Sequence, residues 1–316
     1  MGRNAQRRRS AKEADRGARQ QLGQEPQLNF GRLTRTEVSG DQLKNGRSYD
    51  RQLINRGASL GYRVLEKQPF CWMCPRSSGR RAKEHIFPGW LLERLGAADE
   101  LFEPRHYDLK GTLLSKRGPY PASALLSGEI CDACNHGWMS RLETEFERVL
   151  LGEPAQPWTR EDQQIVAHWF AKTAIVINVS QNYRLLVPKA ERHAAELGVP
   201  PGFEVFVAKT NGHHTHLDFK QGWNMGGWVT PTDQVESMMA LAERCFRCAI
   251  RIDDLVGLVL YAPPNKWLEP EDHFISIWPS AGELLAMADL SQVGWTDDYW
   301  LRPRGMRAVP GEAASS

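Results

Sequence analysis

Two Cys-x-x-Cys pairs constrain this chain more than any other feature of its sequence. The first pair is Cys71 and Cys74, and the second is Cys131 and Cys134. Two intervening residues let both sulfurs of a pair turn onto one ion, and two pairs supply the four thiolates of a tetrahedral zinc site. Such a site has no open coordination position, so we expect a structural zinc ion that stabilises the fold and does not catalyse.

Two further observations bear on the zinc prediction. The gap between the pairs is longer than in a compact zinc ribbon, so more structure must be built between them. The alternative is four ordinary buried thiols, because free cysteine is often buried. The doubled pair favours zinc over that alternative.

The chain shows no sign of a membrane or export segment. No apolar run approaches the length that spans a bilayer, and no apolar segment follows the basic N-terminus as it would in a secretory signal. We therefore expect a cytoplasmic protein without a membrane partner. Thiols stay reduced in that compartment, which favours metal binding over disulfides.

A second motif lies between the cysteine pairs and a third follows them. Lys83-Glu84-His85-Ile-Phe-Pro88 is the first, and Asn135 comes directly after the last cysteine. The order Cys-x-x-Cys, acid-His-x-x-Pro, Cys-x-x-Cys-Asn resembles the HNH endonuclease family, whose core is a ββα-metal (His-Me) finger. The resemblance runs from Cys71 to Glu143, less than a third of the chain.

The resemblance implies a role for each motif residue. Glu84 and Asn135 would bind one divalent ion, His85 would be the general base, the four cysteines would hold zinc, and the products would carry 5′-phosphates. The residue types agree with these roles. Carboxylate and amide oxygens suit Mg²⁺ or Mn²⁺. An imidazole with a pKa of about 6.5 accepts a proton from water at neutral pH.

Each of these residues also has a purely structural interpretation. His85 could be a hydrogen-bonded histidine at a strand end, and Asn135 could be a helix N-cap. Leu126 occupies the position of the family's middle Asn, which braces the loop bearing the His. These points keep a non-catalytic zinc-finger module that binds nucleic acid as an alternative function, together with an RNase on the same fold.

Three basic residues precede the acid-His pair. They would contact phosphates in a nucleic-acid partner, with DNA favoured over RNA, or else form a solvated charge run. These residues are Arg80, Arg81 and Lys83.

The composition pattern predicts four segments. They are a disordered basic tail over 1–59, an HNH nuclease domain with structural zinc over 60–151, an α+β accessory domain over 152–303, and a disordered tail over 304–316. The basic tail either meets phosphates or is simply solvated.

Periodicity predicts the helices. An apolar stripe follows Asn135, namely Trp138, Leu142, Phe146, Val149 and Leu150. Glu143 and Glu147 fall off that stripe, so we expect both on a solvated face. Glu143 is also kept as a residue that could support the site from outside. Thr159-Arg-Glu-Asp162 has the form of a capping box before a helix through Ile165–Ile177. A short helix is expected over Pro188–Leu197.

Short β-prone runs then predict an antiparallel sheet with a helix packed on it, which gives an α+β fold class. Asp253-Asp254 suits a hairpin turn between two of the strands. The predicted strands are Phe203–Ala208, Gly227–Thr230, Cys245–Ile252, Val256–Tyr261 and Phe274–Trp278.

Two other groups of metal-binding residue types receive structural interpretations. Cys245 and Cys248 form a third Cys-x-x-Cys, but they lie in a predicted strand, so we expect core packing. His213-His214-Thr-His216 lacks the acid-His-x-x-Pro context and sits at a turn, so we expect an exposed loop.

Overall fold

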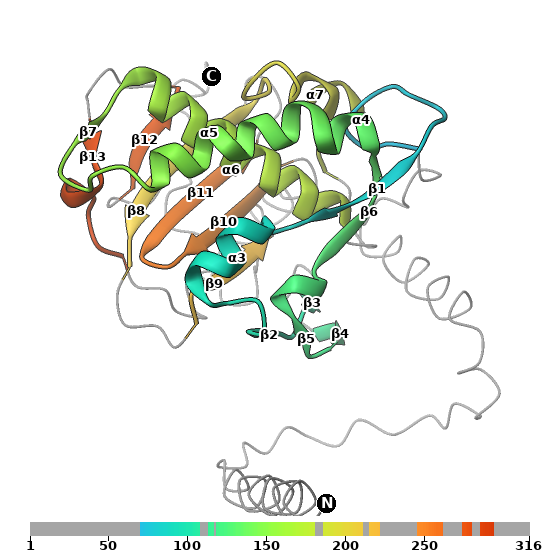
Figure 1. Cartoon of the computed structure of the whole chain (residues 1–316), viewed down its shortest axis with the longest axis horizontal. Helices are drawn as coiled ribbons and strands as arrows, with labels where there is room; N and C mark the ends of the chain where they lie inside the picture. The colour runs from blue at the N-terminus through green and yellow to red at the C-terminus, as the bar shows by residue number, and fades with distance from the viewer. Residues whose placement is uncertain are drawn as a thin grey trace, which may run out of the picture. The chain divides into compact units, whose positions relative to one another are not determined.

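The structure is a computed structural model of the chain, and it describes residues 70–107, 113–116, 118–180, 186–210, 215–221, 245–261, 274–279 and 285–293. All of them belong to one compact unit within residues 49–316. The predicted tails and the predicted strand Gly227–Thr230 lie outside the described residues. The described residues form a mixed α+β fold with an antiparallel sheet, as predicted (Figure 1).

A two-stranded ribbon and the helical segment after it form the first part of the fold. Strands β1 (Arg81–His85) and β6 (Leu126–Cys131) pair antiparallel. The helical segment follows at once as α4 (Asp132–Cys134), η3 (Asn135–Met139) and α5 (Ser140–Leu150), with a kink at Gly137. The predicted apolar stripe is confirmed, because four of its residues are buried and Leu150 is half-buried.

The segment between β1 and β6 forms small elements of its own. Helix α3 (Gly89–Leu95) ends at Gly96, whose left-handed φ of 62° suits a residue without a Cβ. The remaining elements are two short ribbons and a 3-10 turn. They are β2 (Leu101–Phe102) with β5 (Tyr120–Pro121), β3 (Arg105–Tyr107) with β4 (Leu113–Lys116), and η2 (Ala122–Ala124).

Helix α6 (Arg160–Ser180) is the central element, and its predicted start is confirmed. The Thr159 backbone N–H donates to Asp162 Oδ2 over 3.0 Å, and the Asp162 N–H donates to Thr159 Oγ1 over 3.1 Å. These two bonds are the reciprocal pair of a capping box. The helix packs against α5 and against the sheet, so most of its side chains are buried.

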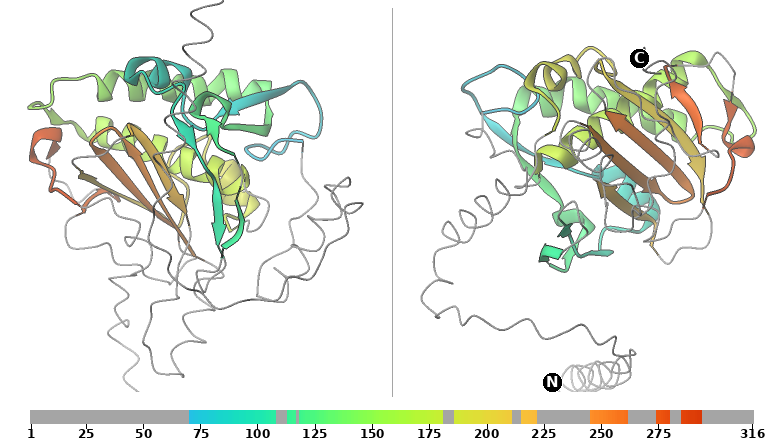
Figure 2. Two further views of the ribbon diagram at one scale, coloured as in Figure 1. Left: turned by 90° about the horizontal axis from the view of Figure 1, so that it is seen from below. Right: turned by 180° about the vertical axis from the view of Figure 1, so that it is seen from behind.

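Five antiparallel strands form the main sheet in the order β12-β8-β11-β10-β9, which Figure 2 shows in front of the helices in its right-hand view. Four of them confirm predicted strands, and the turn between β10 and β11 at Asp253 has a φ of 53°. Strand β9 was not predicted. The strands are β8 (Phe203–Lys209), β9 (Leu217–Gln221), β10 (Phe246–Ile252), β11 (Leu255–Tyr261) and β12 (Ile275–Trp278).

The remaining elements flank the sheet and α6. Helix α7 (Lys189–Ala194) confirms the predicted short helix. Strand β7 (Pro157–Trp158) pairs with β13 (Leu285–Ala286), and the 3-10 turn η4 (Met287–Asp289) follows. Among the described residues, no helix has the length and apolar character needed to cross a membrane.

One hydrophobic core extends across the domain boundary predicted near residue 152. Phe146 of α5 stacks on Trp169 of α6, with ring centroids 4.2 Å apart and ring planes at 6°. The same cluster of buried residues runs from the cysteine pairs to the strands of the main sheet. The segment with the four cysteines and the segment with the sheet therefore stabilise each other by direct packing.

Candidate metal centre and catalytic site

The four predicted zinc ligands meet at one point of the fold. Their sulfur atoms all lie within 4.8 Å of one another and all four side chains are buried. The distance from Cys71 Sγ to Cys134 Sγ is 4.0 Å, and that from Cys74 Sγ to Cys131 Sγ is 3.7 Å. A tetrahedron of sulfurs about 2.3 Å from zinc has edges of about 3.8 Å, whereas a disulfide needs about 2.05 Å. The cluster therefore fits a zinc ion, as predicted.

Backbone hydrogen bonds fix the second cysteine pair against the first. Cys131 ends β6 and its N–H donates to Cys71 Sγ over 3.3 Å. The Asp132 N–H, at the start of α4, donates to the carbonyl of Arg80 over 2.9 Å. The Arg76 guanidinium donates to Cys131 Sγ over 3.7 Å, where its charge offsets the negative charge of thiolates.

The sulfurs are not equivalent in acidity. The hydrogen-bonding contact between the Cys71 and Cys134 sulfurs, 4.0 Å apart, lowers the pKa of Cys71 to about 4, against the opposing effect of burial. That same contact and burial raise the pKa of Cys134, and burial raises the pKa of Cys74. The cluster thus stabilises a thiolate at Cys71, which is the ionised form that a zinc ion binds.

A buried arginine from α7 holds the first cysteine pair in place, and sequence reasoning missed it. Arg192 Nε donates to the carbonyl of Trp72 over 3.2 Å, and its Nη1 donates to that of Val187 over 2.6 Å. The guanidinium also lies 4.9 Å from the centroid of the Trp72 ring. Because one arginine in a short helix has no distinguishing sequence pattern, nothing in the sequence pointed to it.

The predicted metal ligand Glu84 lies in a buried ion pair. Its Oε1 accepts a hydrogen bond from Lys172 Nζ of α6 over 3.0 Å, and the same ammonium donates to Glu143 Oε1 over 2.9 Å. Sequence reasoning missed Lys172, although a charged residue inside an otherwise apolar helix was the available signal. The interpretation of Glu143 as part of a solvated face was wrong, because its side chain is only 20% exposed.

Charges within this trio oppose the effect of burial. Burial raises the pKa of Glu84, and the nearby Glu143 carboxylate adds to this, whereas Lys172 counteracts it. Burial by itself would lower the pKa of Lys172, but the two carboxylates outweigh it and raise that pKa. Lys172 is therefore a cation that pairs with both carboxylates.

His85, the predicted general base, ends β1 with a half-buried side chain. Its Nδ1 is buried, and the imidazole makes no hydrogen bond within the described part of the chain. The alternative of a hydrogen-bonded structural histidine is thus not what the structure shows. Side chains alternate along a strand, so His85 leaves β1 on the face of Arg81 and Lys83, and Glu84 leaves it on the other.

Asn135, the second predicted ligand of the divalent ion, lies inside the helical segment. The helix begins at Asp132 with Cys131 at its N-cap, so Asn135 is not an N-cap residue. Its half-buried side chain makes no hydrogen bond among the described residues, which leaves the amide oxygen available. The segment η3 that it begins lies against β1.

The remaining predicted residues lie on or beside the ribbon. Arg80, Arg81 and Lys83 are all exposed, and the Arg81 guanidinium lies 5.5 Å from the centroid of the Phe70 ring. Leu126, at the position of the family's middle Asn, pairs directly with His85. The backbone closes the ribbon here, because the N–H of residue 86 donates to the carbonyl of residue 125 over 2.9 Å.

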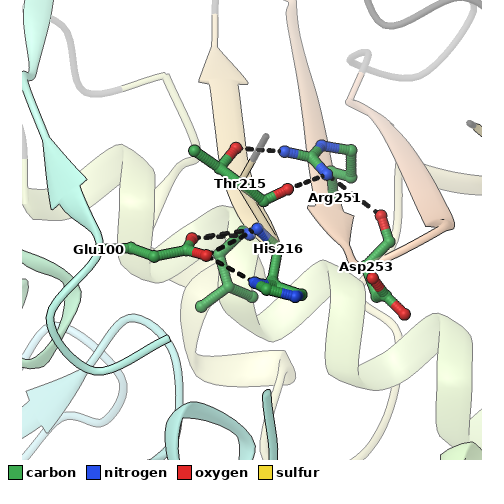
Figure 3. A network of polar contacts seen from close by, with 6 residues as sticks. Glu100, Thr215, His216, Arg251 and Asp253 are labelled. Carbon is green, nitrogen blue, oxygen red and sulfur yellow. Dashed lines mark hydrogen bonds and ion pairs between the residues drawn. The ribbon is translucent and has the colours of Figure 1, made fainter. Parts of the chain in front are cut away.

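The third cysteine pair and the histidine cluster behave as predicted where they are described. Cys245 and Cys248 are buried in separate apolar clusters, so their sulfurs pack the core as expected. His216 is exposed, and its Nδ1 lies 2.6 Å from Glu100 Oε1 (Figure 3). His213 and His214 lie outside the described residues.

The same region ties the segment between β1 and β6 to the main sheet. The Glu100 carboxylate also accepts hydrogen bonds from the backbone N–H groups of His216 and Leu217, and the Arg251 guanidinium of β10 donates to Thr215 beside them (Figure 3). These contacts account structurally for a histidine that could otherwise have been assigned to a metal.

Comparison with known proteins does not assign the chain to a family. The chain matches no protein-family model, and searches of curated proteins and of solved structures found no match.

Proposed function

We propose that this chain is a metal-dependent endonuclease of the HNH type that hydrolyses phosphodiester bonds in DNA. One observation carries the proposal. A four-cysteine cluster joins an antiparallel ribbon to the helix that follows it. Strand β1 of the ribbon ends in an imidazole that makes no hydrogen bond within the described residues and is next in sequence to a buried carboxylate. This combines a structural zinc site with the acid-His pair in one small unit.

Three residues have separate roles in the proposed hydrolysis. His85 accepts a proton from the attacking water, and its imidazole makes no hydrogen bond among the described residues that would compete for this proton. Glu84 and Asn135 supply the oxygens for Mg²⁺ or Mn²⁺, and Glu84 Oε2 is free of hydrogen bonds within the described residues. A bound divalent ion would stabilise the negative charge on the phosphate and on the leaving 3′ oxygen.

Basic side chains on and just before the strand that ends in His85 support a nucleic-acid substrate. Arg81 and Lys83 leave β1 on the face of His85, and the exposed Arg80 precedes them. Contacts to phosphates of this kind position a backbone without reading its sequence. They would hold a phosphodiester next to the general base.

A non-catalytic nucleic-acid-binding module is the second candidate. Two observations favour it: Lys172 already engages the Glu84 carboxylate, and Leu126 stands in place of the middle Asn. In that case the cysteine cluster would stabilise the fold, the basic residues would bind nucleic acid, and His85 would have no chemical role.

A nicking assay separates the two candidates. Full-length protein is incubated with supercoiled plasmid and Mg²⁺ or Mn²⁺, beside His85→Ala and a control, His136→Ala. His136 is an exposed imidazole paired with Asp132 over 3.3 Å in the same region, so the control removes a histidine without touching the base. We expect the parent and the control to nick DNA, and His85→Ala to lose at least about 100-fold in rate.

Other results of the nicking assay would contradict the proposal or favour a different function. Equal nicking by the parent and His85→Ala, with zinc content unchanged, contradicts the assignment of the base. DNA binding without nicking by any of the three proteins favours the binding module. A parallel incubation with single-stranded RNA distinguishes the RNase on the same fold.

A further inference from the structure

The side chain of Lys172, in helix α6, contacts the proposed metal ligand Glu84. Lys172 lies in the middle of α6, and its side chain is 1% exposed. Its ammonium contacts one carboxylate from the ribbon and one from α5, at 3.0 Å and 2.9 Å. One lysine of α6 thus contacts both β1 and α5, through residues 88 and 29 positions away in the sequence.

We propose that Lys172 is a positioning residue, which fixes the Glu84 carboxylate for the divalent ion. This inference rests on the proposed function, because it assigns a task to the same site. The ammonium holds Glu84 Oε1, while Oε2 makes no hydrogen bond within the described residues. A carboxylate held at one oxygen presents the other in a defined direction, as hydrogen-bonded metal ligands do.

Rigid surroundings set the position of the ammonium itself. The capping box fixes the first turn of α6, and the helix is buried on nearly all sides around Lys172. The ammonium also lies 5.7 Å from the centroid of the Trp169 ring, whose indole stacks on Phe146. A long side chain in such packing has few alternative rotamers, so its donor remains in place.

A charged side chain suits position 172 better than a neutral hydrogen-bond donor would, because it contacts two carboxylates. An ammonium between two carboxylates attracts both of them, whereas a neutral donor would leave them to repel each other. Lys172 Nζ contacts Glu84 Oε1 and Glu143 Oε1, so Glu143 serves as the second anchor of Lys172 rather than as a ligand.

Manganese binding to the full-length, zinc-loaded chain tests this inference without relying on cleavage. Isothermal titration with Mn²⁺ compares the parent with Lys172→Met, which keeps the length of the side chain but offers no donor. We expect Lys172→Met to weaken Mn²⁺ binding by about 10- to 100-fold, as loss of a supporting hydrogen bond does at other metal ligands. Glu84→Gln should abolish binding, and Lys172→Arg should restore part of it.

Glu145→Gln is the matched control. It removes an exposed acid from the same helix as Glu143, and this acid makes no hydrogen bond or ion pair among the described residues, so Mn²⁺ affinity should stay close to that of the parent. Zinc content and far-UV circular dichroism report folding for every variant. If Lys172→Met does not fold, Lys172→Gln, which is shorter and uncharged, takes its place with the same expected loss.

The outcomes separate this inference from the proposed function. Mn²⁺ affinity at the parental level in a folded Lys172→Met or Lys172→Gln variant overturns the positioning role, and so does a parent chain that binds no Mn²⁺. Binding that depends on Glu84 and Lys172, in a chain that cuts neither DNA nor RNA, overturns the nuclease but leaves Lys172 in its role.

Discussion

At the scale of single residues, each of the four cysteines contributes one sulfur to a cluster that could hold a metal ion. All four thiols are buried within one small cluster, and the Cys131 N–H also bonds to Cys71 Sγ. A serine at any of these positions provides a poor zinc ligand and leaves three thiolates without their partner. Because zinc binding and folding are coupled in small thiolate sites, losing one ligand affects both.

Cys131→Ser should therefore lose zinc and unfold the ribbon and its helix. His85→Ala should keep both, since its imidazole makes no hydrogen bond among the described residues. Zinc per chain, measured by elemental analysis, and far-UV circular dichroism check this pair. Wild-type zinc content in Cys131→Ser would show that the four sulfurs are not the ligands.

Sequence patterns revealed two kinds of residue: those whose partners are close in the sequence, and those whose partners are the same amino acid. The cysteine pairs and the capping box of Thr159 and Asp162 belong to these kinds. Lys172 and Arg192 do not, because their roles arise only when distant helices pack onto the ribbon and the first cysteine pair. Burial of charge is a tertiary property, and no local pattern specifies it.

At the scale of elements, the start of α6 matters because this helix carries Lys172 and much of the core. Asp162 accepts hydrogen bonds from the Thr159 backbone and hydroxyl, and from the Arg148 guanidinium. Burial opposes ionisation, but these bonds outweigh it and lower the pKa of Asp162. The carboxylate form therefore stabilises the folded state.

Asp162→Ala should lower the free energy of unfolding by about 1 kcal/mol at pH 7. This pKa is lowered on folding, so the contribution of Asp162 is complete above the unfolded value of about 3.9. It is lost as the pH falls further and the folded carboxyl takes up a proton. Urea unfolding at pH 7 and at pH 3 measures the difference, which should shrink at the lower pH.

Glu161→Ala serves as the control for this prediction. It removes an exposed acid from the same turn of α6. A pH-independent difference between Asp162→Ala and the parent would show that the capping hydrogen bonds do not depend on the charge.

The prediction of elements succeeded where apolar residues formed a clear run or a helical stripe. The strands β8, β10 and β11 are short runs rich in apolar residues, and the apolar residues of α5 and α6 recur at helical spacing. Strand β9, with the sequence Leu-Asp-Phe-Lys-Gln, carries three polar residues, and the short ribbons between β1 and β6 are only two to four residues long. Such segments become strands through their pairing partners rather than through their own composition.

At the scale of the whole molecule, the continuous core predicts a single cooperative unfolding transition. Gly257 of β11 lies under α6, and a Cβ at this position would meet the Phe170 ring at 2.3–2.5 Å. Phe170 belongs to the same aromatic cluster as Trp169 and Phe146. A disturbance beneath α6 should therefore reach the helix that follows the cysteine pairs.

Gly257→Ala should lower the free energy of unfolding by about 1–3 kcal/mol, because the added methyl group overpacks the interface. Zinc release, followed with a chromogenic chelator, should move to lower temperature together with the change in tryptophan fluorescence. Gly89→Ala is the control, since a Cβ there meets nothing within 4 Å. Zinc release at an unchanged temperature would mean that the metal centre unfolds separately.

The separation of the two cysteine pairs along the chain also affects biosynthesis. Cys74 and Cys131 are 57 positions apart. At about 5–20 residues per second, a ribosome needs about 3 to 11 seconds to travel between them. During this time the nascent chain contains Cys71 and Cys74 but not yet Cys131 and Cys134. A four-sulfur site can therefore form only after the second pair has been synthesised.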